Sequence, residues 1–204
     1  MKGLRSAGSA ISALIVVVCL PACGHKPPDD RDYATKVAAE RADKDALFLK
    51  GSDPIPENRK AELLPLSYFP IDPLYNVPAS LKPSQNETII PMTTSIGTQR
   101  QYRIVGTLEF LLKAQSMKLT ALVEVGAPDL DRLFVPFNDM TSGTETYPAG
   151  RYLDLDRNAA GIYELDFNRA YQPYCYYNAS YECPYPPPEN RLKVPIRAGE
   201  RMKK

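Results

Sequence analysis

Residues 102–125 read YRIVGTLEFLLKAQSMKLTALVEV and contain two runs in which side chains at alternate positions are mostly apolar. A period of two indicates β-strands that bury one face, and the short segment KAQS between the runs allows only a tight turn. The sequence therefore predicts an antiparallel hairpin in the core of the protein. The side chains expected on its buried face are Tyr102, Ile104, Leu108, Phe110, Leu112, Met117, Leu119, Ala121, Val123 and Val125.

Four further segments have the composition of strands: RLFVPF, GRYLDL, IYELDF and LKVPI (residues 132–137, 150–155, 162–167 and 192–196). Their spacing is typical of an antiparallel meander, and DRNAAG between two of them is expected to form a hairpin loop. No helical pattern of useful length separates them, which disfavours a parallel sheet. The sequence predicts a mainly β fold, an antiparallel β-sandwich or small barrel. An N-terminal helix and an irregular, proline-rich C-terminal loop complete it.

Two segments precede the hairpin. Residues 32–49, DYATKVAAERADKDALFL, have helical character with a thin apolar stripe, so this helix is expected on the domain surface. Residues 61–79, AELLPLSYFPIDPLYNVPA, are apolar but interrupted by prolines, which prevent a regular element. We expect this segment to lie extended across a sheet edge or a barrel mouth.

The N-terminus has the features of a lipoprotein signal. Lys2 and Arg5 precede an apolar run at residues 10–20, which is shorter than the ~20 residues of a membrane span. The run ends in LPAC, which resembles the bacterial lipobox and predicts acylation of Cys23. We expect a signal peptide at residues 1–22, a tether at 23–32 and a single domain at 33–204.

The same signal predicts where the protein resides. Gly24 occupies the position at which an aspartate would retain a lipoprotein in the inner membrane. We therefore expect a lipid-anchored protein of the bacterial cell envelope, on the outer membrane, facing the periplasm or the cell exterior. The formal net charge is only +1, with no long run of one sign, so nucleic acid is not an expected partner.

Cys175 and Cys183 are the only cysteines beyond the predicted signal and lipidation site. Outside the cytoplasm, such an isolated pair points to a disulfide that closes a small loop. A redox dithiol is an alternative, although the spacing is not C-x-x-C. A zinc site would need further ligands, and the only histidine is His25 in the expected tether. Residues 154–166 match a calcium loop poorly, with Ala159 and Leu165 at two key positions. No metal or cofactor is expected.

The loop PFNDMTSGTETYPAGRY, residues 136–152, is rich in polar side chains and carries Arg151 at its end. An arginine among carboxylates and hydroxyls either binds an anion or is the buried partner of Asp139 or Glu145. Templates for Ser–His and Cys–His catalysis fail because His25 is in the tether. A carboxylate pair drawn from Asp139, Glu145, Asp166 and Glu189 would still allow hydrolase chemistry.

Three long motifs resemble the bacterial domain-of-unknown-function family 1684 (DUF1684): LSYFPIDPLYNVPA, LFVPFNDMTSGTETYPAGRYLDL and DFNRAYQPYCYYNASYECPYPPPENRLKVPIRAGE. The resemblance spans about residues 34–200, with small departures at Pro148 and Gln172, and the family implies no established activity. It implies that the motif positions form a binding site or a braced core. They are Asp139, Thr141, Gly143, Thr146, Tyr147, Gly150, Arg151, Asp166, Asn168, Tyr171, Pro173, Cys175, Pro184, Pro187, Glu189 and Asn190.

These observations lead to a hypothesis of an envelope lipoprotein whose β domain binds a ligand or an envelope protein. A carboxylate-dependent enzyme and a structural or assembly factor are the alternatives. The absence of tryptophan argues slightly against a carbohydrate-stacking surface. The candidate binding residues are Asp139, Thr141, Glu145, Tyr147, Arg151, Asp166, Asn168, Glu189 and Asn190.

Overall fold

The computed structural model describes residues 32–51 and 53–203. The expected signal peptide (residues 1–22), the expected lipidation site Cys23 and residues 24–31 of the expected tether lie outside this part of the chain. The described residues belong to one compact unit.

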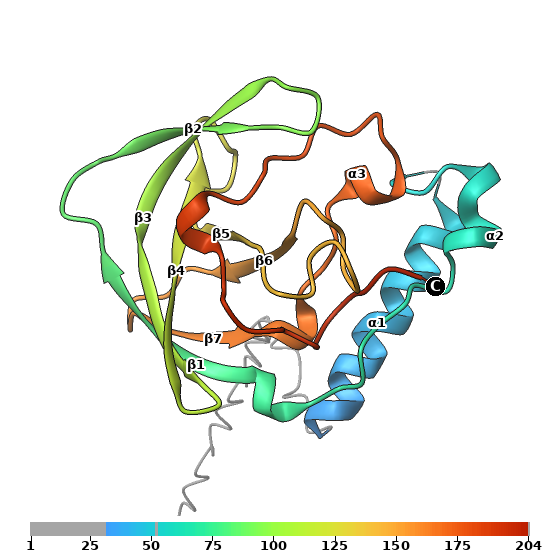
Figure 1. Ribbon diagram of the computed structural model, residues 1–204, viewed down its shortest axis with the longest axis horizontal. Coiled ribbons are helices and arrows are strands. Elements are labelled where there is room, and N and C mark those ends of the chain that lie inside the picture. Colours follow the sequence, from blue (N-terminus) through green and yellow to red (C-terminus); the bar gives the residue numbers. More distant parts are fainter. Residues whose placement is uncertain (1–31, 52, 204) are drawn as a thin grey trace, which may run out of the picture. The chain divides into compact units, whose positions relative to one another are not determined.

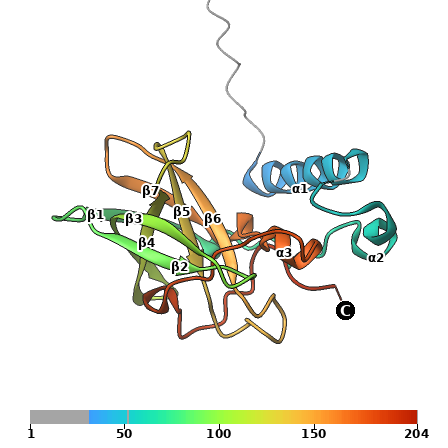
Figure 2. The ribbon, with the colours of Figure 1, turned by 90° about the horizontal axis from the view of Figure 1, so that it is seen from above.

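Antiparallel strands form a nearly closed barrel, in which six strands follow the order β6–β5–β4–β3–β1–β7 (Figures 1 and 2). A further strand, β2, pairs with the first part of β3. This confirms the predicted mainly β fold, in its barrel form. The strands are β1 (Asn76–Pro83), β2 (Ile89–Thr93), β3 (Gln99–Leu112), β4 (Gln115–Glu124), β5 (Arg132–Phe137), β6 (Arg151–Asp156) and β7 (Ile162–Asp166).

Helices and 3₁₀ turns connect and cover the strands. The α-helices are α1 (Tyr33–Lys50), α2 (Lys60–Leu63) and α3 (Tyr174–Tyr177). The 3₁₀ turns are Glu57–Arg59, Pro73–Tyr75, Phe167–Arg169 and Pro188–Asn190.

The predicted hairpin is formed by β3 and β4, joined by a turn of two residues. Lys113 and Ala114 have φ values of 50° and 63°, as a two-residue turn between twisted strands requires. On β4, Leu119, Ala121 and Val123 point into the barrel, as the alternation predicted.

One part of the hairpin prediction is wrong: the expected apolar face of β3 is divided between two sides of the sheet. The β3–β4 register shifts between Ile104 and Gly106, so that Val105 is an extra residue in β3. A bulge of one residue reverses the faces beyond it. Leu108, Phe110 and Leu112 fill the barrel, whereas Tyr102 and Ile104 pack on the outer face of the sheet.

Gly106 makes this bulge possible. A Cβ atom at Gly106 would collide with the main-chain carbonyl of Lys82 on the neighbouring strand β1. The outer face therefore carries a second apolar cluster around Met92, Tyr102 and Leu122. Tyr102 of this cluster lines the cleft described below.

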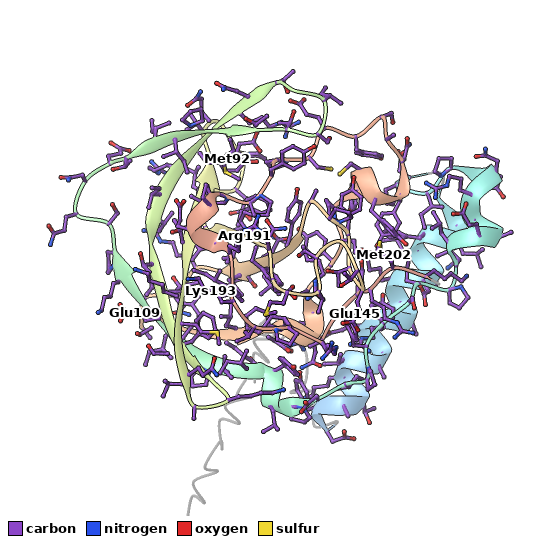
Figure 3. The ribbon with its side chains drawn as sticks, in the orientation of Figure 1. Met92, Glu109, Glu145, Arg191, Lys193 and Met202 are labelled. Carbon is purple, nitrogen blue, oxygen red and sulfur yellow. The ribbon has the colours of Figure 1, made fainter. Side chains whose placement is uncertain are left out.

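The predicted C-terminal strand LKVPI is not formed. Residues 191–200 make only isolated bridges, Arg191 with Asn138 and Glu200 with Tyr68. Pro195 has no N–H to donate, and the segment instead places Leu192 and Ile196 in the barrel core. Arg191 and Lys193 mark its course across the barrel in Figure 3.

The loop at residues 157–161 connects β6 to β7, which are the two ends of the sheet and share no ladder in the described chain. The predicted hairpin is therefore wrong at this place. Asn158 stabilises the turn, since its side chain accepts from Gly161 N (2.9 Å) and donates to Ile162 O (2.9 Å).

Helix α1 lies outside the barrel, as expected from its thin apolar stripe (Figure 2). Val37 and Phe48 are its buried residues, and Asp32 caps its N-terminus by accepting from Thr35 N. It also makes polar contacts with the domain, such as the ion pair of Lys44 with Glu200. Among the described helices, none has both the length and the apolar composition of a membrane span.

The proline-rich segment at residues 61–79 was only partly predicted. Its middle part is extended and holds Leu66 and Phe69 in the interior. Its last residues form the start of β1, which is an inner strand between β3 and β7 and not a covering at an edge. Pro78 is exposed in this strand and lies opposite Glu164 of β7.

Candidate functional site

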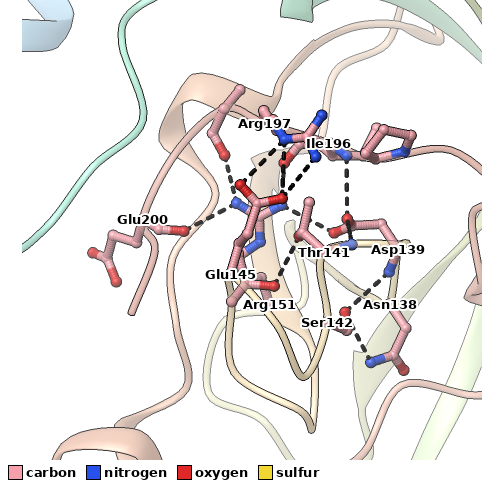
Figure 4. Close-up of polar contacts among 12 residues, drawn as sticks. Asn138, Asp139, Thr141, Ser142, Glu145, Arg151, Ile196, Arg197 and Glu200 are labelled. Carbon is pink, nitrogen blue, oxygen red and sulfur yellow. Dashed lines mark hydrogen bonds and ion pairs between the residues drawn. The ribbon is translucent and has the colours of Figure 1, made fainter. Parts of the chain in front are cut away.

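Arg151 is the centre of a buried polar network (Figure 4). It begins β6 on the same face as Leu153 and Leu155, which places its side chain inside the domain with no exposed surface. Its Nη2 donates to Asp139 Oδ2 (3.0 Å) and to Ile196 O (2.7 Å). Nη1 donates to the carbonyls of Ala198 and Glu200.

Asp139 is the carboxylate of this network, and its side chain is also buried. Its Oδ1 accepts from Thr141 N (2.7 Å) and Ile196 N (3.1 Å), while Oδ2 accepts from Arg151. Burial lowers the pKa of Arg151, and the Asp139 carboxylate opposes that shift. The pair thus ties the loop after β5 to the C-terminal segment, which is the geometry of a brace.

The remaining candidates in this loop also have partners. Thr141 is buried, and its hydroxyl lies 2.9 Å from that of Thr146. Glu145 pairs with Arg197 at the surface (2.9 Å). Tyr147 is half-buried, and desolvation raises its pKa to about 12.

Asp166 and Asn168 form a second buried polar group, next to the first turn of α1. Asp166 Oδ1 accepts from Tyr33 OH (2.8 Å), and Asp166 Oδ2 pairs with Arg169. The Asn168 amide donates to Tyr33 OH and to Asp72 O, each at 2.8 Å. These bonds attach the first turn of α1 to the start of the barrel.

Asn190 is fully buried between β4 and β5. Its Nδ2 donates to Thr120 O (2.9 Å) and Pro136 O (2.8 Å), and its Oδ1 accepts from Thr120 N (2.7 Å). The pairing of Leu122 with Phe134 sets the register of β4 and β5, and it places Thr120 opposite Pro136, which has no N–H. The Asn190 amide therefore supplies the hydrogen bonds that the two strands cannot make with each other. Glu189, its neighbour, is exposed.

Glu200 has a structural role that sequence reasoning missed. This glutamate is buried, and its carboxylate accepts from Lys44 Nζ (2.5 Å), Gln172 N (2.8 Å) and Tyr177 OH (2.5 Å). It joins α1, α3 and the segment after β7. A charged residue in a C-terminal stretch rich in charge carries no sequence signal of burial.

The four carboxylates considered for hydrolysis have separate partners. Asp139 is bonded to Arg151, Glu145 to Arg197 and Asp166 to Arg169, while Glu189 is exposed. None of the four lines the cleft that surrounds Phe134 and Tyr152.

That cleft, with a volume of about 690 Å³, lies on the outer face of the sheet. Phe134, Tyr152 and Asp154 are the outward positions of β5 and β6, alternating with the core residues. The segment from Tyr171 to Pro184 covers one side of it, and Lys44 of α1 reaches its margin. The aromatic residues that line it are Tyr102, Phe134, Tyr152, Tyr171, Tyr174 and Tyr181.

The rings form a continuous row. Tyr102 stacks on Phe134 with centroids 5.6 Å apart, and Phe134 meets Tyr152 edge-on at 4.8 Å. Tyr152 in turn meets Tyr171 at 5.8 Å. Such offset and edge-on pairs hold one another in place, so this surface is built before any ligand arrives.

Charged residues surround the row of rings in pairs. Arg100 lies 3.3 Å from both Glu124 and Glu182, and Arg132 lies 3.1 Å from Asp154. A cleft of this size, with an apolar surface and a few polar groups around it, is the usual form of a small-molecule site.

Cys175 and Cys183 lie together as two buried free thiols, without the predicted disulfide, and Cys183 lines the cleft. Cys183 Sγ accepts from Cys175 N at 3.1 Å. The hydrogen bond from the Cys183 thiol lowers the pKa of Cys175 to about 7, and the same contact raises the pKa of Cys183. The sequence analysis thus correctly placed the two cysteines next to each other. It predicted a disulfide between them, whereas the structure has two thiols.

Comparison with known proteins gives a family and a fold. Residues 62–201 match the family model described as "Protein of unknown function (DUF1684)". The solution NMR structure of an uncharacterised protein of Haloarcula marismortui is similar, with 36% sequence identity and a TM-score of 0.66. The match covers 82% of this chain and 93% of that one. No curated protein matches.

Proposed function

The chain belongs to the DUF1684 family, and from this premise we propose that it is an envelope lipoprotein whose barrel domain binds a ligand in the aromatic cleft. The single observation that carries the binding role is the cleft itself, about 690 Å³ in volume with a prebuilt row of rings. In this proposal Asp139, Arg151 and Asn190 brace the barrel and do not touch the ligand.

The binding role is tested with a library of water-soluble small molecules and the full-length protein in detergent. Ligand-detected NMR should find binders whose signals are lost with Phe134→Ala, because Phe134 is the central ring of the row. The matched control is Tyr185→Ala, since Tyr185 is 41% exposed and does not line the cleft. Binding that is indifferent to Phe134→Ala, or no binders at all, would refute the role.

The proposed lipid anchor leads to a second expected result. Cys23→Ser should release the protein from membranes, because each acyl chain contributes about 0.8 kcal/mol per buried CH₂ and no acyl chain would remain. Cys19→Ser is the matched control, since Cys19 lies in the apolar run and not at the lipobox position. Membrane fractionation after a high-salt wash, with an acyl label as a second readout, measures both. Retention of the Cys23→Ser variant on membranes would contradict the lipoprotein assignment.

We also propose that Cys175 and Cys183 are joined as a disulfide in the oxidising envelope. The thiols are adjacent, and closing so short a loop stabilises a protein by about 2–3 kcal/mol. Thiol titration of unfolded, unreduced protein should find neither residue free. A reductant should lower the stability of the wild type by that amount and leave a Cys175→Ser/Cys183→Ser double variant unchanged. Two titratable thiols in protein purified from the envelope would contradict the proposal.

A further inference from the structure

The tyrosine hydroxyls of the ring row have only their accepting capacity left for a ligand. The hydroxyls of the buried or half-buried tyrosines in the ring row all donate within the protein. Tyr102 donates to Glu124 (3.3 Å), Tyr152 to Pro184 O (2.6 Å) and Tyr171 to Asp154 (2.7 Å). Burial raises the pKa of each of these tyrosines, so each keeps its proton and its donor stays engaged. Capacity to accept remains, on the phenol and carboxylate oxygens.

The charges of the cleft are largely satisfied as well. Each basic residue that lines the cleft has a carboxylate partner: Arg100 and Arg132 pair with residues of the cleft, and Lys44 pairs with Glu200. Among the acidic residues that line the cleft, Asp129 is the one for which the described part of the chain provides no salt bridge. An ionic ligand would therefore find little unbalanced charge, whichever sign it carried.

Ring surface is available beside these acceptors. Tyr174 is 43% exposed, and its ring meets that of Tyr181 edge-on with centroids 5.3 Å apart. Phe134 is half-buried in the row opposite. An aromatic ring presents a weakly negative face, which attracts the polarised C–H groups of a flat, non-aromatic ring.

A matching ligand is neutral, brings many O–H donors and has an apolar C–H face. We infer that the cleft binds a neutral oligosaccharide. This inference rests on the proposed function and narrows it to one ligand class. The sequence contains no tryptophan, so tyrosine and phenylalanine rings provide the surface on which the sugar would stack.

Other ligands that favour aromatic grooves match less well. A proline-rich peptide presents carbonyl acceptors and few donors, and the hydroxyl donors of the ring row are already used. A polyamine would find one carboxylate without a salt bridge, Asp129, and would have to compete with arginines for the other three. The oligosaccharide is the ligand class that uses both the rings and the free acceptors.

The test is calorimetric titration of the full-length protein, in a detergent whose head group is not a sugar. The probes are cellotetraose, chitotetraose and maltotetraose, with decaproline and spermidine as the competing classes. At least one tetrasaccharide should bind. Tyr174→Ala should weaken that binding about five- to tenfold, the value of a lost aromatic contact, and Tyr185→Ala should not.

The other outcomes overturn the inference in distinguishable ways. Binding of decaproline or spermidine that Tyr174→Ala weakens, with none of the tetrasaccharides bound, would refute the oligosaccharide and leave the cleft as a binding site. Tetrasaccharide binding that Tyr174→Ala does not change would place the sugar elsewhere and also refute the inference. If no probe binds, the oligosaccharide is refuted, and the small-molecule library then decides whether the cleft binds ligands at all.

Discussion

Arg151→Met is expected to destabilise the protein by about 3–5 kcal/mol, the usual result of removing one partner from a buried ion pair. Methionine keeps the unbranched aliphatic part of the side chain and lacks the guanidinium, so the main loss is that of the charge and its hydrogen bonds. Asp139 would remain as a carboxylate in the interior without its cation. The carbonyls of Ile196, Ala198 and Glu200 would lose their donors at the same time.

Urea denaturation followed by circular dichroism measures this loss. The control is Arg197→Met, which removes an arginine from the same region, since Arg197 pairs with Glu145 at the surface. Its denaturation midpoint should be almost unchanged, because exposed pairs contribute little. If Arg151→Met also leaves the midpoint unchanged, Arg151 does not brace the fold, and its role would have to be sought in ligand binding.

Asn190→Leu is expected to cost about 3 kcal/mol or more. Leucine has a similar volume, but it would leave Thr120 N–H, Thr120 C=O and Pro136 C=O without partners, and an unpaired buried group costs about 1–3 kcal/mol. Strands β4 and β5 would then be joined mainly through Leu122 and Phe134.

A second substitution separates this mechanism from a simple packing defect. Pro136→Val restores an N–H opposite Thr120, so in the Asn190→Leu background it should recover about 1 kcal/mol, the net value of one hydrogen bond. The same change in the wild type should bring no such gain, because the Asn190 amide already occupies the gap. Equal effects in the two backgrounds would contradict the proposed replacement of strand hydrogen bonds by Asn190.

The parts of the fold that were predicted correctly depend on local pattern. Alternation in residues 117–123 determined which side chains of β4 face the core, and this face is continuous. The alternation in β3 failed at Val105 because a bulge depends on the close approach of another strand, here at Lys82. A bulge that is set by a distant carbonyl leaves no periodic signal in its own strand.

Arg151 shows how far a strand pattern can be taken. In GRYLDL it has the same parity as Leu153 and Leu155, so the inward face of β6 and the burial of Arg151 follow from the sequence. Its partner does not follow, since Asp139 and Glu145 are both within reach along the loop. The structure assigns the buried pair to Asp139 and gives Glu145 to Arg197.

The cleft was not predicted, because its lining comes from distant parts of the chain. Tyr102 reaches the outer face only because of the bulge in β3. Phe134 and Tyr152 face outward because side chains alternate along β5 and β6. Tyr174 is placed there by the fold of the C-terminal segment. The aromatic density of residues 171–185 was visible in the sequence. Nothing in it showed that β3, β5 and β6 would supply the opposite side of a cleft.

The central claim is that ligands bind in the aromatic cleft while the Arg151 network supports the fold. Chemical-shift mapping with the tightest-binding member of the small-molecule library tests it most directly. We predict that the shifted amide signals gather on the outward residues of β3, β5 and β6 and on residues 171–184. Shifts concentrated instead on the loop from Asp139 to Tyr147 and around Arg197, with the cleft unchanged, would contradict the account.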